Sequence, residues 1–186
     1  MNSLKAGITA VAAACTLAAA SLAFADHDDD GVEYPEAFRS FTHVTTGIVT
    51  PGFTMNVNGE DVDLGAQVPG LHNIYANRRA MIGYRQLAAA RPTRFPEGAV
   101  IAFDLWEPGV LNSGTGSFTF QKQRLAVAVM EKNRQKYYAT GGWGFQVFDP
   151  VTQKPLLKPA DQEACFACHE ALTEKGADFV FSRFSN

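Results

Sequence analysis

The stretch Cys165-Phe166-Ala167-Cys168-His169, close to the C-terminus, is the most informative part of the chain. Two thiols three positions apart, followed at once by histidine, form the pattern at which haem c is attached. Each thiol can add to one vinyl group of the porphyrin, and the adjacent imidazole can then ligate the iron. A redox disulfide does not need the histidine, and a zinc tetrahedron would need a further pair of ligands. The pattern therefore predicts one covalent haem c, held by Cys165 and Cys168, with His169 as the metal ligand.

The position of the motif bears on the sixth iron ligand. A small electron-transfer cytochrome c supplies a methionine far downstream of its haem pentamer. No methionine follows His169, and Met55, Met81 and Met130 precede it as residues suited to filling gaps in a core. We therefore expect an iron with no sixth ligand from the protein, open to a small molecule.

Residues 1–25 have the features of a secretory signal peptide. Lys5 provides a positive charge, an apolar run follows it, and Ala23-Phe24-Ala25 is a small-residue cleavage site. Cleavage would leave residues 26–186 as one haem c domain with no membrane span, long enough for a hydrophobic core. It would also remove Cys15, so that both remaining cysteines belong to the haem motif. Haem c is attached outside the bacterial cytoplasm, so we expect a periplasmic protein.

The charge of the chain limits its partners. The formal net charge of −3 argues against nucleic acid or an anionic membrane surface as a partner. The acidic stretch from Asp26 to Gly31 begins like a calcium loop, but the twelfth position is Ala37 where a calcium loop has glutamate. We interpret this stretch as a solvated tail.

Hydrophobic patterning predicts an α+β fold, mostly antiparallel sheet with a few helices, in which the C-terminal helix carries the haem. The expected strands cover residues 41–50, 71–75, 98–106, 117–123, 124–132, 146–148 and 179–184. Helices are expected at residues 78–91, with Asn77 as N-cap, and at residues 159–176. Residues 108–116 are expected to form a loop, and Asn58-Gly59 to close a hairpin. Long amphipathic helices are missing, which excludes the four-helix cytochromes c′.

Several stretches spread over nearly all of residues 26–186 carry a family resemblance. They are Tyr34-Pro35 with Phe38-Arg39, His72 to Asn77, Gly83-Tyr84-Arg85, Phe95 to Val100, Thr140 to Phe145, the haem pentamer, and Asp178 to Phe184. On these residues the chain resembles the cytochrome P-460 family, which includes the cytochromes c′-beta. The closing segment after the haem pentamer is the most specific of them. The resemblance implies a β-rich fold, commonly a homodimer, with a five-coordinate haem.

The two branches of that family differ at one position. Cytochromes P-460 cross-link a lysine to the haem edge and oxidise hydroxylamine, whereas cytochromes c′-beta place a phenylalanine over the distal face and bind nitric oxide and carbon monoxide. The position of that lysine falls on Phe103, so this chain is similar to the c′-beta branch. An apolar ring offers no hydrogen bond to bound dioxygen, which needs charge stabilisation more than the other two gases do. From the residues alone, an ordinary core position is the favoured interpretation of Phe103, and it is the resemblance that favours the distal pocket.

Three polar residues leave alternatives open. His72 falls near a distal arginine of the enzyme branch, where it could donate to a ligand or move protons, or it could lie outside the pocket. Asp178 falls near a catalytic acid of that branch, or it could be structural. Arg183 could bind a haem propionate or form a surface salt bridge.

The sequence leads to three hypotheses of function. The first is a haem protein that binds nitric oxide or carbon monoxide in a hydrophobic distal pocket. The second is an oxidoreductase acting on hydroxylamine, nitric oxide or peroxide without the cross-link, with His72 or Asp178 moving protons and a redox partner protein exchanging electrons. The third, a simple electron carrier, is the least favoured because the sixth ligand is missing. Whether the protein is an enzyme is left open.

Overall fold

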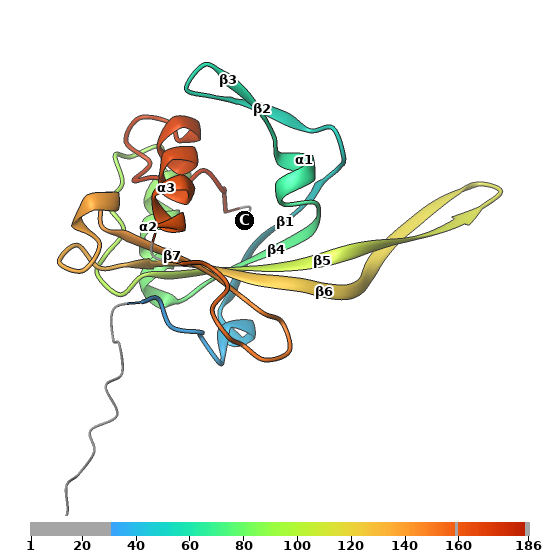
Figure 1. Cartoon of the computed structure of the whole chain (residues 1–186), viewed down its shortest axis with the longest axis horizontal. Coiled ribbons are helices and arrows are strands. Elements are labelled where there is room, and N and C mark those ends of the chain that lie inside the picture. Colours follow the sequence, from blue (N-terminus) through green and yellow to red (C-terminus); the bar gives the residue numbers. More distant parts are fainter. Residues whose placement is uncertain (1–30, 159, 185–186) are drawn as a thin grey trace, which may run out of the picture.

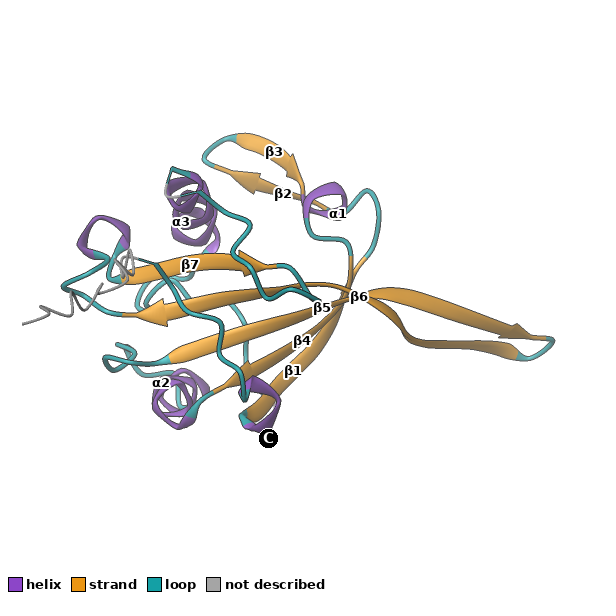
Figure 2. Cartoon of the chain, turned by 60° about the horizontal axis from the view of Figure 1, so that its bottom comes forward, coloured by secondary structure: helices purple, strands orange, loops and turns teal. Residues whose placement is uncertain are grey.

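The computed structural model describes residues 31–158 and 160–184, so the predicted signal peptide and nearly all of the acidic tail lie outside the described residues. An antiparallel five-stranded sheet, in the order β1-β4-β5-β6-β7, forms the centre of the fold (Figures 1 and 2). Its strands are β1 (Thr42–Val49), β4 (Gly70–Ala76), β5 (Val100–Ser113), β6 (Gly116–Lys132) and β7 (Trp143–Phe148). The main helices are α2 (Arg78–Ala88) and α3 (Asp161–Leu172). The predicted α+β class is confirmed.

Short elements complete the chain. They are η1 (Phe38–Ser40), β2 (Thr54–Val57), β3 (Glu60–Asp63), α1 (Leu64–Gln67) and η2 (Tyr138–Thr140). β2 and β3 pair with each other, and Asn58 and Gly59 close their hairpin with φ angles of 55° and 94°. Positive φ at both turn residues is what a tight hairpin requires, and the Asn-Gly pair supplies it. Among the described residues, no helix has the length and apolar character needed to span a membrane.

The two faces of the sheet are covered by different parts of the chain. On one face, which we call the haem-motif face, α2 and α3 pack against a core that includes Ile101, Met130 and Phe145. On the other face, the N-terminal residues 31–41 cover a second cluster that includes Val127 and Phe148. Figure 1 shows α3 and the N-terminal segment on opposite sides of the strands. Successive residues of β5 therefore point into two separate environments.

Helix α2 begins where the sequence predicts. The Asn77 side chain accepts a hydrogen bond from the Ala80 amide at 2.8 Å, which confirms the expected N-cap. The helix ends at Ala88, three residues earlier than predicted, and Ala90 follows with a φ of 52°. Its Gly83 lies against the ring of Phe95, where a Cβ would come within 2.4 Å of that ring. This close approach fixes α2 tightly against the core.

The predicted loop at residues 108–116 is wrong. β5 continues to Ser113 and turns directly into β6, so residues 107–123 form a two-stranded projecting arm (Figure 1). The two separate strands expected at 117–123 and 124–132 are also wrong, because both belong to β6 and pair with β5. Register shifts on either side of Trp106 accommodate Pro108, and Gly109 makes room for the Phe120 ring.

The strand expected at residues 179–184 is wrong as well. This segment has no regular secondary structure, and Asp178 and Phe179 adopt φ angles of 49° and 64°. Left-handed backbone at two consecutive residues other than glycine cannot continue as a strand, and it costs of order 1–3 kcal/mol per residue unless its surroundings impose it. The contacts that impose it lie beside the haem motif.

Candidate haem site

The haem motif lies on α3, as predicted, although the helix is shorter at both ends than expected. Cys165 and Cys168 are one helical turn apart, and His169 follows Cys165 by four residues, so the three side chains share one side of the helix. No residue of α3 is fully buried, and both cysteines are half-buried free thiols. Burial raises the pKa of both thiols, so they are uncharged near neutral pH.

The imidazole of His169 is held in one tautomer. Its Nδ1 lies 2.9 Å from the carbonyl oxygen of Phe179, and a carbonyl can only accept, so Nδ1 carries the proton and Nε2 carries the lone pair. The rings of Phe145 and Phe181 lie 5.0 Å and 4.8 Å from the imidazole, centroid to centroid. Burial lowers the pKa of His169, which favours the neutral ring that a metal requires.

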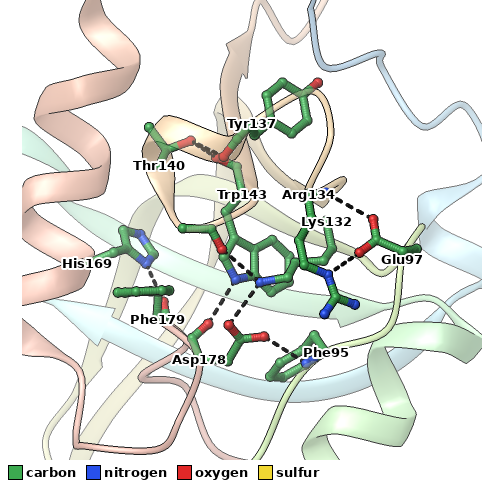
Figure 3. A network of polar contacts seen from close by, with 11 residues as sticks. Phe95, Glu97, Lys132, Arg134, Tyr137, Thr140, Trp143, His169, Asp178 and Phe179 are labelled. Atoms are coloured by element: carbon green, nitrogen blue, oxygen red, sulfur yellow. Dashed lines mark hydrogen bonds and ion pairs between the residues drawn. The ribbon is translucent and has the colours of Figure 1, made fainter.

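The turn that presents the Phe179 carbonyl is anchored on three sides (Figure 3). The carboxylate of Asp178 accepts from the Phe95 amide at 2.7 Å and from the Lys132 ammonium at 2.8 Å. The carbonyl of the same residue accepts from the indole nitrogen of Trp143 at 2.8 Å. These contacts explain how the left-handed backbone is maintained. They engage Asp178 as part of a structural network.

Lys132 was not predicted to be a site residue, and Trp143 was noted only as part of the family stretch Thr140 to Phe145. The Lys132 side chain is 2% exposed, donates to the Gly141 carbonyl at 3.0 Å and lies 4.9 Å from the centre of the Trp143 ring. Burial lowers its pKa, and the bond to Asp178 opposes that shift. A lysine at the end of a predicted strand gives no sequence signal for such a position. The only available hint was the neighbouring Gly141-Gly142-Trp143 stretch.

Phe103 lies on the haem-motif face of the sheet. It is paired with Ile74 on β4 and with Ala128 on β6, and opposed residues in antiparallel strands point to the same face. The register of β6 with β7 extends this face to Phe145, which contacts His169. Phe103 is partly buried against the same core cluster as Cys165 and Phe166.

The other two predicted polar residues have partners in the protein. His72 lies on the same face as Phe103, but its Nε2 lies 2.8 Å from the Val68 carbonyl and so donates to it. Burial lowers the pKa of His72, and this hydrogen bond partly opposes the shift. Arg183 forms an ion pair with the exposed Glu174 at 2.9 Å, which corresponds to the surface salt bridge considered above.

The side chains of α3 fit a haem c. Two uncharged thiols and an imidazole with its lone pair at Nε2 share one side of a helix, and aromatic rings enclose the imidazole. A hydrogen bond from the remote ring nitrogen to a carbonyl is the usual outer-shell contact of a histidine that ligates a metal.

Comparisons with known proteins agree with this geometry. The family model described as Cytochrome P460 matches residues 35–182. A comparison with curated proteins found no match. The family match covers most of the chain and includes the sheet, α2 and the whole of α3. The chain therefore belongs to the cytochrome P460 family and is a c-type haem protein.

Proposed function

We propose that this protein is a periplasmic monohaem cytochrome that binds nitric oxide or carbon monoxide at a five-coordinate haem. Cys165 and Cys168 would carry the two thioether bonds, and His169 would hold the iron through Nε2. The observation that carries the proposal is the placement of Phe103 on the haem-motif face, against the core that includes Cys165. There its ring would line the distal pocket.

The surroundings of Phe103 favour apolar ligands. Its cross-strand neighbours Ile74 and Ala128 cannot donate a hydrogen bond, and His72 already donates through Nε2 to Val68. Bound dioxygen requires charge stabilisation from such donors, whereas nitric oxide and carbon monoxide require less. No lysine occurs in β5, so the cross-link of the enzyme branch has no partner on this strand.

The variant Phe103→Ala tests the pocket. Removing the ring should open the distal side, so the association rate of carbon monoxide with the ferrous protein should rise by at least about tenfold, or about 1.4 kcal/mol in the barrier. Flash photolysis would measure the rate. Phe41→Ala removes an equally large ring from the opposite face of the sheet and should leave the rate unchanged. Equal rates in Phe103→Ala and the native protein would place Phe103 outside the pocket.

The oxidoreductase alternative makes a different prediction. Asp178 is engaged by Lys132 and the Phe95 amide, and His72 by Val68, so neither is an unengaged proton carrier. We therefore expect no steady oxidation of hydroxylamine with an artificial electron acceptor. Steady turnover, or a red-shifted band of a lysine-modified haem in the reduced spectrum, would favour the enzyme instead.

We also propose that the protein forms a homodimer through the projecting arm. Within the arm, residues 107–123, β5 and β6 pair only with each other among the described strands. The outer edge of each strand is therefore uncovered there. Its side chains Leu111, Phe118 and Phe120 are 65%, 64% and 40% exposed, and the two phenylalanine rings stack at 6.0 Å. A two-stranded hairpin is marginally stable alone in water, so a second copy that pairs with it would stabilise it.

Sedimentation velocity tests the dimer. The native protein is expected to sediment as a dimer, and Phe118→Asp as a monomer, because a carboxylate would be buried without a partner. Val151→Asp adds the same charge at a position that is 86% exposed and lies outside the arm, so it should remain dimeric. A monomeric native protein would contradict the proposal.

A further inference from the structure

The buried ion pair of Lys132 and Asp178 lies one peptide unit away from the hydrogen bond of His169. The Asp178 carboxylate meets the Lys132 ammonium at 2.8 Å, and the next residue, Phe179, presents its carbonyl to His169 Nδ1 at 2.9 Å. Figure 3 shows Lys132 and Trp143 reaching Asp178 from the sheet, while His169 approaches Phe179 from α3. The turn at residues 178–179 therefore joins the end of β6 to the proximal histidine.

The direction of the Phe179 carbonyl depends on this turn. Both of its residues are left-handed, a conformation that residues other than glycine keep only when their surroundings require it. On the Phe179 side, Gly141 lies under the ring, where a Cβ would come within 2.4 Å of it. On the Asp178 side, the only charged partner among the described hydrogen bonds is Lys132.

We propose that Lys132 and Asp178 are positioning residues for the proximal histidine. By fixing the turn, the pair aims the Phe179 carbonyl at His169 Nδ1. The strength of that hydrogen bond then sets how strongly Nε2 donates to the iron. This inference rests on the proposed role of His169 as the iron ligand.

The chemistry follows from the acceptor. A well-aligned carbonyl draws the Nδ1 proton away from the ring and makes Nε2 a stronger donor. A stronger donor raises the iron–histidine stretching frequency and stabilises the ferric form, which lowers the reduction potential. If the turn relaxes, the carbonyl swings away, the frequency falls and the reduction potential rises.

The surroundings of Lys132 and Asp178 should allow variants of either residue to fold. A cavity of about 470 Å³ is lined by Lys132, Asp178 and Phe179, together with Glu170 of α3 and Thr173, which follows that helix. Water in this cavity could solvate a carboxylate left without its ammonium, which favours folding of the variants below. The methionine side chain has nearly the length of lysine and carries no charge, so Lys132→Met removes the ion pair with little change in volume.

The experiment uses the full-length holoprotein and two variants, Lys132→Met and Asp178→Asn. The resonance Raman frequency of the iron–histidine stretch in the ferrous form and the reduction potential are measured for each. Both variants are expected to shift the frequency downward and the potential upward. Asp178→Asn should shift them in the same direction, because its single amide oxygen can replace only one of the two carboxylate oxygens, Oδ2 that accepts from the Phe95 amide or Oδ1 that accepts from Lys132.

The matched control is Glu97→Gln. It breaks the ion pair between Glu97 and Arg134, whose two side chains are each about half exposed. This pair lies in the same region of the protein but does not contact the turn at residues 178–179. It should leave both readouts at the native values. A merely structural role of Lys132 would lower the unfolding midpoint and move neither readout.

The outcomes separate this inference from the proposed function. An iron–histidine band that is present in the native protein and unmoved in both variants would overturn the positioning role alone. Absence of that band in the native protein would overturn the assignment of His169 and, with it, this inference. If Lys132→Met yields no folded holoprotein, Asp178→Asn decides by the same two readouts.

Discussion

Cells that produce the double variant Cys165→Ser, Cys168→Ser should yield a protein with no covalently attached haem. Only a thiol adds to a haem vinyl group, and a serine hydroxyl of similar size does not. The two cysteines lie one turn apart on one side of α3, so their replacement should preserve the helix and leave His169 in place. Haem staining after denaturing electrophoresis should show a strong band for the native protein and none for the variant.

The two single variants, and a control variant at the third cysteine, Cys15, show which residues hold the haem. Each single substitution should leave one thioether bond, which shifts the pyridine haemochrome band because one vinyl group remains conjugated with the ring. Cys15→Ser should give native staining, since Cys15 lies in the predicted signal peptide. Retention of the stain in the double variant would mean that another residue tethers the haem.

The parts of the site that the sequence could predict are those in which chemistry and spacing are local. The haem pentamer, the helix that carries it and the N-cap at Asn77 each depend on residues within a turn or two. The face of Phe103 follows from strand alternation alone, once β5 is recognised. These expectations needed no knowledge of distant contacts.

The contacts that the sequence could not give join residues far apart in the chain. Lys132 and Asp178 are 46 positions apart, and Trp143 and Asp178 are 35 apart. The phenylalanines at positions 179, 181 and 184 predict a strand at the end of the chain. Instead, Lys132 of β6 and Trp143 of β7 bind Asp178 and hold residues 178–179 in a left-handed turn. In the arm, Pro108, Gly109 and Gly114 favour a loop locally, yet pairing with β6 outweighs that preference.

The variant Asp104→Ala should cause the largest loss of stability. Asp104 follows Phe103 on β5 but points to the opposite face, where it is 1% exposed. Its carboxylate lies 2.8 Å from the guanidinium of Arg124 and 3.0 Å from that of Arg39, which ties the N-terminal segment to the sheet. Both guanidiniums also lie over the Trp106 ring, at 5.0 Å and 5.4 Å. The aspartate is thus the anion between two cations.

Without that anion, Arg124 would stay charged beside Arg39 while mostly buried. Breaking a buried pair from one side typically costs about 3–5 kcal/mol, and we expect a loss of this size in the free energy of unfolding measured by denaturant titration of the holoprotein. Glu107→Ala, on the same strand, breaks a half-exposed pair with Lys122 and should cost less than about 1 kcal/mol.

The affinity for carbon monoxide should be the same in folded Asp104→Ala as in the native protein, because Asp104 faces away from His169. If the two variants were equally stable, the Asp104 cluster would contribute no more than a surface pair. Altered binding in Asp104→Ala would instead indicate that the two faces of β5 are coupled.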